Sequence, residues 1–396
     1  MANVSSSNGL EKRPKLRFPG FDEPYKQCRI GDIYAERSQR GASDMELLSV
    51  TMNDGVKPRS EIEGKDNSSE DKSNYKIVRK GDMVYNSMRM WQGANGISPC
   101  DGIVSPAYTV LMPKQEINNG YFAALFKSVT LINEFRKNSQ GMTSDTWNLK
   151  YPQIETIKVQ IPSVSEQDKV SELFSVLDER IATQAQLVES LKKYKRGLLS
   201  QLIAQKKAFD TSGEWKTVKL GHIFKERTER AKGNETLLAV TISNGVQQRD
   251  EIDLKDNSSD DKSNYKCVYI GDIAYNTMRM WQGASGVSPY NGIVSPAYTI
   301  VTPIRPDLHN MTFWAYYFKY SPLVQTFQKY SQGLTSDTWN LKFPQFSEIA
   351  VTMPPISEQD KIAECLSVFD EHCKCEDEKL QALLQVRTSL LQQLFI

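Results

Sequence analysis

The chain has 396 residues, of which 39% are hydrophobic and 24% charged, a composition typical of soluble proteins with two or three domains. Lysine and arginine (49) nearly balance aspartate and glutamate (48), so the net charge of +1 neither requires nor excludes a nucleic-acid partner. No apolar run reaches the roughly 18 residues of a membrane span, and the start lacks the apolar core of a secretion signal. We therefore expect a cytoplasmic protein with no membrane partner.

A long internal repeat organises the sequence. Two segments of 29 residues agree at 21 positions, at an offset of about 190 residues, which is far beyond chance. Agreement resumes further along, after a two-residue insertion in the second copy. The fixed segments are 82–110 with 272–300, and 139–153 with 331–345. Because the differences concentrate in 111–138 and 301–330, packing or binding must hold the other segments fixed.

Each copy of the repeat has a globular part followed by a long helix. The globular part is rich in Tyr, Val, Ile, Ser and Thr and is punctuated by turn dipeptides, which predicts mixed α/β structure with many short strands. The helices open at Ser165 and Ser357, in a Ser-Glu-Gln-Asp sequence that resembles a capping box. The predicted boundaries are 1–161 for an N-terminal arm and first globular domain, 162–210 for the first helix and a linker, 211–354 for the second globular domain, and 355–396 for the second helix.

Apolar residues recur along both helices at alternating spacings of three and four, the pattern of a coiled-coil seam. The seam positions include Leu177, Ile181, Leu191 and Leu198 in the first helix, and Phe369, Leu380, Leu383 and Leu390 in the second. Polar residues interrupt the seam at matching positions and have charges suited to pairing across it: Gln184 and Lys195 in one helix, Glu376 and Arg387 in the other.

Each helix could pack on its own globular neighbour, but the matched seams favour pairing of the two helices with each other. The predicted fold class is therefore mixed α/β. We expect two globular α/β domains, joined and separated by two long helices that form an antiparallel coiled coil with approximate two-fold symmetry.

Catalytic signatures are absent from the sequence. It contains no phosphate-binding loop, no dinucleotide fingerprint, no nucleophile elbow and no HExxH motif. The three histidines do not repeat between the halves, and the six cysteines do not match, so neither a catalytic residue nor a disulfide framework is predicted. His372, Cys373 and Cys375 lie too close together on one predicted helix to surround a metal ion. The chain is predicted to bind rather than to catalyse.

The first fixed segment carries side chains suited to DNA. Read as a strand, it points tyrosine, arginine and tryptophan to the surface and its methionines, Met88 and Met90, into the core. Arginine can bond guanine twice, glutamine can do the same for adenine, and aromatic rings pack on sugars or bases. The candidate base contacts are Tyr85, Arg89, Trp91 and Gln92, with Tyr275, Arg279, Trp281 and Gln282 in the second copy. The alternative is that Arg89 and Trp91 form a buried structural pair.

Loops dense in lysine and small polar residues suit phosphate contacts, which position a protein on DNA without reading its sequence. The candidates are Lys65, Asn67, Ser68, Lys72, Asn74 and Lys76 in the first copy, and Lys255, Asn257, Ser258, Lys262, Asn264 and Lys266 in the second. Lys150 and Lys342, each following a Thr-Trp-Asn-Leu sequence, are further candidates. A solvated turn explains the lysine-rich loops about equally well.

Several segments together carry a resemblance to a known family. They are KLRFPGF near the start, the entry segments ending RIGDI and KLGHI, the YNSMRMWQGA and IVSPAYT patches, and the helix openings IPSVSEQDKV and MPPISEQDKI. Over essentially its whole length, the chain resembles the specificity (S) subunit of a type I restriction-modification enzyme.

The resemblance implies two target-recognition domains, each reading half of a bipartite site in double-stranded DNA. It implies paired spacer helices that dock methyltransferase (M) subunits, two of them, together with restriction (R) subunits. This chain would then hold no cofactor of its own, while its partners bring S-adenosylmethionine, ATP and Mg²⁺. The expected location is the cytoplasm of a bacterium or archaeon.

One departure from the family matters, because the two recognition domains of family members commonly differ whereas these are closely similar. Similar domains related by a two-fold axis should read similar sequences in opposite orientation, so we expect a near-palindromic site. Substitutions beside the fixed patch that could alter this symmetry are Asn95 to Ser285, Cys100 to Tyr290 and Asp101 to Asn291. The rival interpretation is a duplicated coiled-coil scaffold that binds no DNA.

Overall fold

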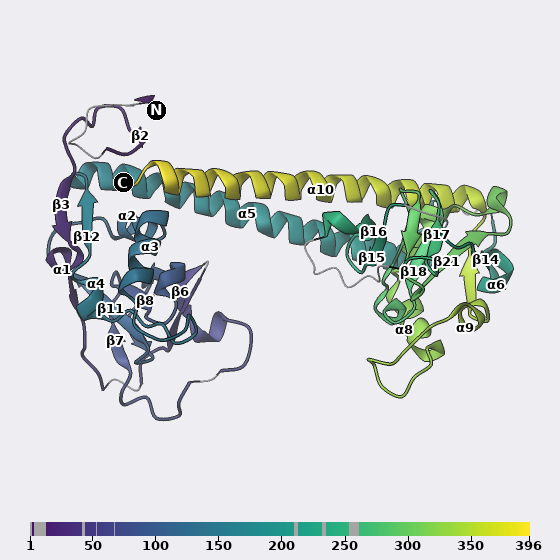
Figure 1. Ribbon diagram of the computed structural model, residues 1–396, viewed down its shortest axis with the longest axis horizontal. Coiled ribbons are helices and arrows are strands. Elements are labelled where there is room, and N and C mark those ends of the chain that lie inside the picture. The colour runs from purple at the N-terminus through teal and green to yellow at the C-terminus, as the bar shows by residue number, and fades with distance from the viewer. Residues whose placement is uncertain are drawn as a thin grey trace. The chain divides into compact units, whose positions relative to one another are not determined.

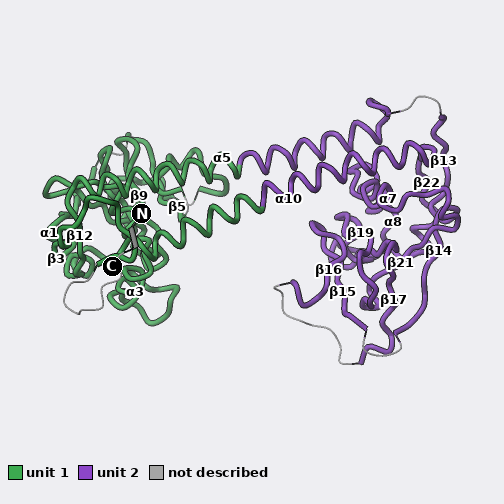
Figure 2. Tube along the Cα trace, turned by 90° about the horizontal axis from the view of Figure 1, so that it is seen from above, with its two compact units in different colours: residues 1–185, 378–396 green, residues 186–377 purple. Residues whose placement is uncertain are grey.

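The computed structural model (Figure 1) divides into two compact units. Unit 1 comprises residues 1–185 and 378–396, and unit 2 comprises residues 186–377 (Figure 2). The structure describes residues 2–3, 13–41, 44–52, 54–66, 68–209, 213–231, 235–252 and 261–396. Each unit therefore combines one globular domain with part of both long helices.

A four-stranded antiparallel sheet forms the centre of the globular domain of unit 1. Its order is β4 (Tyr34–Glu36), β11 (Tyr108–Pro113), β8 (Met83–Asn86) and β9 (Asn95–Ile97). Val84 of β8 faces a small valine-rich core, whereas Met83 and Tyr85 face the main core, so both faces of this sheet are covered. This explains why β8 is apolar at successive positions instead of alternating with polar residues.

Shorter elements surround this sheet. Two-stranded ribbons are formed by β1 (Ala2–Asn3) with β2 (Leu16–Arg17), β3 (Lys26–Arg29) with β12 (Lys158–Ile161), β5 (Leu48–Thr51) with β6 (Gly55–Pro58), and β7 (Lys76–Val78) with β10 (Gly102–Val104). The helical segments are α1 (Ile30–Ile33), η1 (Arg59–Glu61), η2 (Met90–Gln92), α2 (Asn119–Leu125), α3 (Val129–Asn138) and α4 (Tyr151–Ile154).

The globular domain of unit 2 repeats this order. Its central sheet has the order β14 (Phe224–Glu226), β21 (Tyr298–Pro303), β18 (Ile273–Asn276) and β19 (Ser285–Val287). Its two-stranded ribbons are β13 (Lys216–Lys219) with β22 (Ala350–Met353), β15 (Leu238–Thr241) with β16 (Gly245–Gln248), and β17 (Lys266–Val268) with β20 (Gly292–Val294). The helical segments are α6 (Leu220–Ile223), η3 (Arg249–Glu251), η4 (Met280–Gln282), η5 (Pro306–Leu308), α7 (Met311–Tyr317), α8 (Ser321–Tyr330) and α9 (Phe343–Ser347). The prediction of mixed α/β domains with many short strands is confirmed.

The long helices are α5 (Val164–Ile203) and α10 (Ile356–Gln393), and they pair antiparallel within each unit. In unit 1 the early part of α5 meets the end of the chain, where the Phe174 and Phe395 rings stack at 5.9 Å. In unit 2 the late part of α5 meets the early part of α10, through Tyr194 and Phe369 at 5.5 Å. The eight predicted seam residues are all partly buried, as a seam requires: Leu177, Ile181, Leu191, Leu198, Phe369, Leu380, Leu383 and Leu390.

The helices also pack on the globular domains, so the two alternatives for their apolar stripes are not exclusive. Val170 and Phe174 of α5, with Leu394 and Phe395, complete the main core of unit 1. Leu202 and Ile203 of α5 do the same in unit 2, together with Ile362 and Leu366 of α10. Helix pairing and docking on the domains are thus continuous within each unit.

The polar residues at each helix start bind the globular domain, which corrects the capping-box interpretation. Glu166 is almost fully buried and accepts hydrogen bonds from Arg17 Nε and Nη2, both at 2.9 Å. Gln167 Oε1 accepts the backbone N–H of Asn118 at 3.0 Å. In unit 2, Trp215 Nε1 donates to Glu358 at 3.0 Å. The Ser-Glu-Gln-Asp sequence therefore fastens each long helix to its domain.

The seam cations pair across the two helices, but with partners other than those expected. Lys195 donates to Asp370 in unit 2, and Arg387 donates to Asp178 in unit 1, so neither pairs with a polar residue of the seam itself. Gln184 and Glu376 are buried at seam positions. In the part of the chain that the structure describes, no helix is long and apolar enough to cross a membrane.

Candidate nucleic-acid interface

The arginine turn, residues 86–93 and their copy 276–283, follows the central strands β8 and β18. Asn86 Oδ1 accepts the backbone N–H of Met88 at 3.0 Å, and Arg89 N donates to Asn86 O at 2.9 Å. The 3₁₀-helix η2 then ends at Gly93, which has φ +88, a left-handed conformation suited to glycine. The second copy has the same bonds, with Gly283 at φ +79. Local hydrogen bonds thus define the shape of this turn twice.

The structure corrects the strand interpretation of this segment. Strand β8 ends at Asn86, so the alternation of side chains does not extend to Arg89 and Trp91. Tyr85 and Tyr275 are fully buried in the main cores, where burial raises the pKa of both phenols. The prediction that they contact DNA is therefore wrong for this conformation. Met90 is buried as expected, whereas Met88 is 39% exposed.

The arginines and glutamines of the turn are available to a partner. Arg89 is half-buried and Arg279 exposed, and Gln92 and Gln282 are both exposed. Among the described residues, none of these four side chains has a hydrogen-bond or ion-pair partner. They lie on a turn whose backbone is held by its own bonds, so they can contact a ligand without rebuilding the fold. Whether they contact bases remains a prediction.

Trp91 links the turn to the second fixed segment. Its indole N–H donates to Met88 O at 3.0 Å, and its ring packs edge-on against Trp147 at 5.2 Å. Trp281 and Trp339 form the same contact at 5.1 Å in unit 2. The cation over the Trp91 ring is Arg136, so the alternative of a buried Arg89–Trp91 pair is wrong. The half-buried tryptophans have a structural role and also present part of their rings to solvent.

The second fixed segment forms the tip loop, residues 140–148 and 332–340. Paired backbone bonds between Gln140 and Asn148, at 3.0 and 2.8 Å, close its base. Gly141 has φ +145, and a Cβ there would come within 2.6 Å of Thr146 O, so this position requires glycine. The backbone N–H of Leu149 donates to Ser87 O at 2.8 Å, which anchors the loop on the arginine turn. Met142 in this loop is 100% exposed, as is Leu334 in the copy.

A basic cleft of about 240 Å³ lies beside the arginine turn in unit 1. Its walls include Arg40, Lys150, Asn148 and Ser87, which come from three separate parts of the repeat. The copy of the repeat retains these side chains or a close equivalent, as Arg230, Lys342, Asn340 and Thr277.

The charges of the cleft are only partly compensated. Lys150 has no hydrogen-bond or ion-pair partner among the described residues, and Arg40 makes a single 3.4 Å bond to Asn74 Oδ1. Lys76 is paired with Glu36 at 3.1 Å. The cleft therefore offers two cations, Arg40 and Lys150, an arrangement suited to an anion.

The other predicted phosphate contacts have mixed outcomes. Lys76 is buried and Lys266 half-buried, and each donates to a carboxylate and to a backbone oxygen, which makes them structural and corrects the prediction. Lys65, Asn74, Asn264, Lys150 and Lys342 are exposed, and Ser68, Lys72 and Lys262 are half-buried. Lys72 Nζ donates to Ser69 O at 3.2 Å. Asn67, Lys255, Asn257 and Ser258 lie outside the described residues.

A half-buried lysine supports the arginine turn. Lys319 Nζ donates to Gly283 O, at the end of the turn, and to Ile242 O at 3.0 Å. Burial lowers the pKa of Lys319 to about 8. Lys127 occupies the matching place in unit 1, where burial and the nearby Arg387 guanidinium lower its pKa. Neither lysine was identified from the sequence, although both copies have the same Phe-Lys pair at this place.

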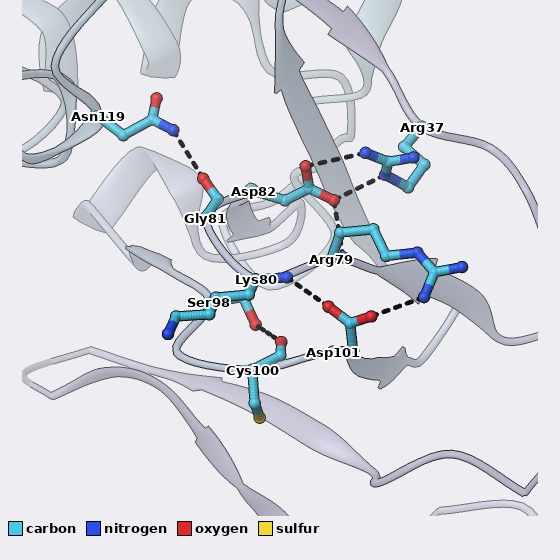
Figure 3. A network of polar contacts seen from close by, with 9 residues as sticks. All are labelled: Arg37, Arg79, Lys80, Gly81, Asp82, Ser98, Cys100, Asp101 and Asn119. Carbon is cyan, nitrogen blue, oxygen red and sulfur yellow. Dashed lines mark hydrogen bonds and ion pairs between the residues drawn. The ribbon is translucent and has the colours of Figure 1, made fainter.

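The candidate symmetry-breaking substitutions do not lie on the arginine turn. Figure 3 shows Asp101 accepting from Arg79 Nη1 at 2.6 Å and from Lys80 N at 2.8 Å, at the opposite end of β8. In unit 2 its counterpart Asn291 accepts the backbone N–H of Ile270 at 2.9 Å. Asn95 and Ser285 are fully buried, so neither can touch a ligand directly. Asn95 and Ser285 instead donate to the last carbonyl of the turn, Gly93 O at 3.0 Å and Gly283 O at 3.4 Å, so this substitution lies beneath the turn.

Comparisons with known proteins agree with this architecture. The sequence profile described as "Type I restriction modification DNA specificity domain" matches residues 23–193 and 212–385. The chain belongs to this family of specificity domains, and it carries two copies. The fixed segments of the repeat thus lie within family domains. The arginine turn and the tip loop occur in both copies, and the basic cleft is described in unit 1.

Individual relatives are more distant. The type I restriction enzyme MjaVIII specificity subunit of Methanocaldococcus jannaschii is 28% identical over 184 residues, which is 43% of this chain and 41% of that protein. The match thus spans about two fifths of that relative. The S subunit structure from M. genitalium has a TM-score of 0.58 at 15% identity, covering 97% of this chain and 99% of that one.

A further solved structure comes from a study of complex assembly and conformational transition of the type I R-M system. It has a TM-score of 0.57 at 14% identity, over 95% of this chain and 98% of the other. At these identities the structural likeness concerns the fold alone. Among the described residues, no group of three or more His, Cys, Asp or Glu side chains is placed to hold a metal ion.

Proposed function

We propose that this chain is the non-catalytic specificity subunit of a type I restriction-modification system and that each globular domain binds one half of a bipartite site in double-stranded DNA. Family membership supports the class of protein. The observation that supports DNA contact is that the two fixed segments meet at one surface. The unpartnered Arg89 and Gln92 lie on the arginine turn. Leu149 anchors the tip loop on this turn, and the basic cleft opens beside it.

The chemistry of this surface fits duplex DNA. A guanidinium and an amide on a fixed turn can form paired hydrogen bonds to base edges in the major groove. The flanking cations, Arg40 and Lys150, suit phosphates, which position the domain without reading sequence. Because the arginine, glutamine and lysine positions are the same in both domains, the two half-sites should be similar, and the whole site an interrupted near-palindrome.

The chain would direct partner subunits to this site. In our proposal the paired α5 and α10 helices dock two methyltransferase subunits, which bring S-adenosylmethionine for adenine methylation. Restriction subunits would bring ATP and Mg²⁺ for translocation and cleavage. No residue of this chain is assigned to that chemistry.

Binding of the purified chain to duplex DNA tests this proposal. A pool of duplexes with randomised centres, enriched over several rounds by the purified chain, should converge on a bipartite sequence. Binding of the enriched duplex should weaken as salt rises, because phosphate contacts release counterions. Failure to enrich any sequence, with no salt-dependent binding to duplex DNA, would contradict the proposal and favour a scaffold that binds protein alone.

A further inference from the structure

The fully exposed side chains at the two tips of the tip loops are the starting observation. Met142 and Leu334 are each 100% exposed, and an apolar side chain of this size in water forgoes the gain from burial. Single exposed apolar residues are ordinary on protein surfaces. What is unusual is that the residues around this position are identical in both copies, while the tip itself changes between methionine and leucine and stays apolar.

The tip loop is built to hold this side chain outward. In unit 2 the loop base is closed by Gln332 and Asn340, with backbone bonds of 3.0 and 2.8 Å, and Thr338 N donates to Thr335 O at 2.9 Å. Gly333 has φ +138. Figure 1 shows the segment between α8 and α9 extending away from the body of the domain. A loop whose backbone is fixed in this way loses little conformational freedom when its tip becomes covered.

The tip is also continuous with the arginine turn. Trp147 packs on Trp91, and Leu149 N bonds to Ser87 O, so the base of the loop is attached to the turn. Other apolar side chains at matching positions are exposed around the same turn: Met88 and Met278 at 39% and 42%, and Met52 and Ile242 at 40% and 50%. Lys319 bonds to both Ile242 O and Gly283 O, which places Ile242 beside the turn in unit 2.

We propose that Met142 and Leu334 are apolar wedges that enter a groove of the bound duplex and pack against its bases. This inference rests on the proposed function and extends it, because it assigns base contact to two residues that have no polar group. Apolar side chains on protruding elements insert between base steps or pack on base edges in other DNA-binding proteins. Small polar neighbours, Thr143 and Ser144, allow a close approach to the sugar-phosphate backbone on either side.

The test uses a full-length double variant that carries both Met142→Ala and Leu334→Ala. Its affinity for the duplex that the wild type enriches is compared with that of the wild type. Binding should weaken by about tenfold for each tip, because each loses most of a buried apolar side chain. The slope of log affinity against log salt should stay unchanged, because an apolar contact releases no counterions. The matched control exchanges the tips, Met142→Leu with Leu334→Met, and should bind within about twofold of the wild type.

The alanine substitutions should not change the stability of the fold, because fully exposed side chains contribute no packing. Urea midpoints of the alanine variant and the wild type should therefore coincide. If the alanine variant binds the enriched duplex as the wild type does, the inference is overturned. If it keeps DNA binding but loses binding of a purified methyltransferase subunit, the tips contact protein and the inference is likewise overturned. If the wild type enriches no duplex, the proposed function fails as well.

Discussion

Lys195 of α5 forms an ion pair with Asp370 of α10 within unit 2, and Arg387 of α10 forms the equivalent pair with Asp178 of α5 within unit 1. The two pairs occupy corresponding positions of the repeated helices, and each cation also lies over an aromatic ring: Lys195 over Tyr316 at 4.7 Å and Arg387 over Phe174 at 6.0 Å. Tyr316 belongs to α7 of the globular domain, so the pair in unit 2 links both helices to that domain, whereas Phe174 belongs to α5 itself. The duplication has preserved the contact and not only the residue types.

These pairs should contribute little stability compared with the buried pair at the helix start. Both carboxylates are 50% exposed, and exposed ion pairs are worth roughly 0.2–1 kcal/mol. Lys195→Ala should therefore lower the free energy of unfolding by about 1 kcal/mol or less. Chemical denaturation followed by circular dichroism gives this value, and a loss of several kcal/mol would show that the pair is better shielded than its exposure indicates.

Arg17→Met should cost much more. Arg17 and Glu166 are 8% and 1% exposed, so removing the guanidinium leaves a buried carboxylate that still accepts a hydrogen bond from the Tyr25 hydroxyl at 3.2 Å. Breaking such a pair typically costs about 3–5 kcal/mol. The double variant with Glu166→Gln should recover part of the loss, since it removes the unpaired charge. Equal stability of Arg17→Met and the wild type would contradict the role of Arg17 as the clamp on α5.

Lys319 gives a prediction about pH. Its pKa is lowered from 10.5 to about 8, so between these values the unfolded chain binds a proton that the folded chain has released. Stability from this group therefore rises with pH from about 8 to 10.5, and the cost of the buried charge is fully present below pH 8. The difference in unfolding free energy between the wild type and Lys319→Met should shift in favour of the wild type from pH 7.5 to pH 9.5. A difference that is independent of pH would exclude this titration.

The basic cleft should determine part of the salt dependence of DNA binding. Arg40→Gln with Lys150→Gln removes two unpaired cations from the cleft of unit 1. If both contact phosphates, the slope of log affinity against log salt should fall by about 2, with little change in sequence preference. Lys76→Gln is an unsuitable control because Lys76 is buried with Glu36. The exposed Lys158 of β12 provides a control, and its change to glutamine should leave the slope unaltered.

Arg89 and Arg279 should affect one half-site each. A bidentate contact between arginine and guanine contributes about 1–3 kcal/mol of discrimination. Arg89→Ala should therefore relax base preference at one position in one half of the enriched site, and Arg279→Ala should do so at the corresponding position of the other half. Repeating the enrichment with each variant measures this. Relaxation at both halves by a single variant would contradict the assignment of one domain to one half-site.

Local periodicity explains why some features were predictable. The alternating three and four spacing of Leu177, Leu191 and Phe369 depends only on helix geometry, and so the paired helices were predicted from it. Tyr85 shows the limit of the same reasoning. The strand that carries it ends one residue later, at Asn86, where an Asn side chain bonds to the backbone of Met88 and starts a turn. The prediction extended the alternation of strand side chains beyond Asn86, and it therefore assigned the following side chains to the wrong faces.

Contacts between distant segments could not be predicted. Lys76 is identical between the copies and follows a lysine-rich segment, but its partner Glu36 is 40 residues away. The cleft formed by Arg40, Ser87 and Asn148 depends on how three segments meet. For Met142, the sequence showed an apolar residue inside a fixed segment, and only the structure shows that the side chain faces solvent.

The most direct test of the central claim is a genome-wide map of methylated adenines in cells with and without this chain. We predict that methylation which depends on the chain falls at one bipartite sequence whose two halves are the same or differ by a base or two when read in opposite orientation. Methylation at a site with unrelated halves would contradict the claim that two similar domains read similar sequences, and methylation that does not depend on the chain would contradict its role as a specificity subunit.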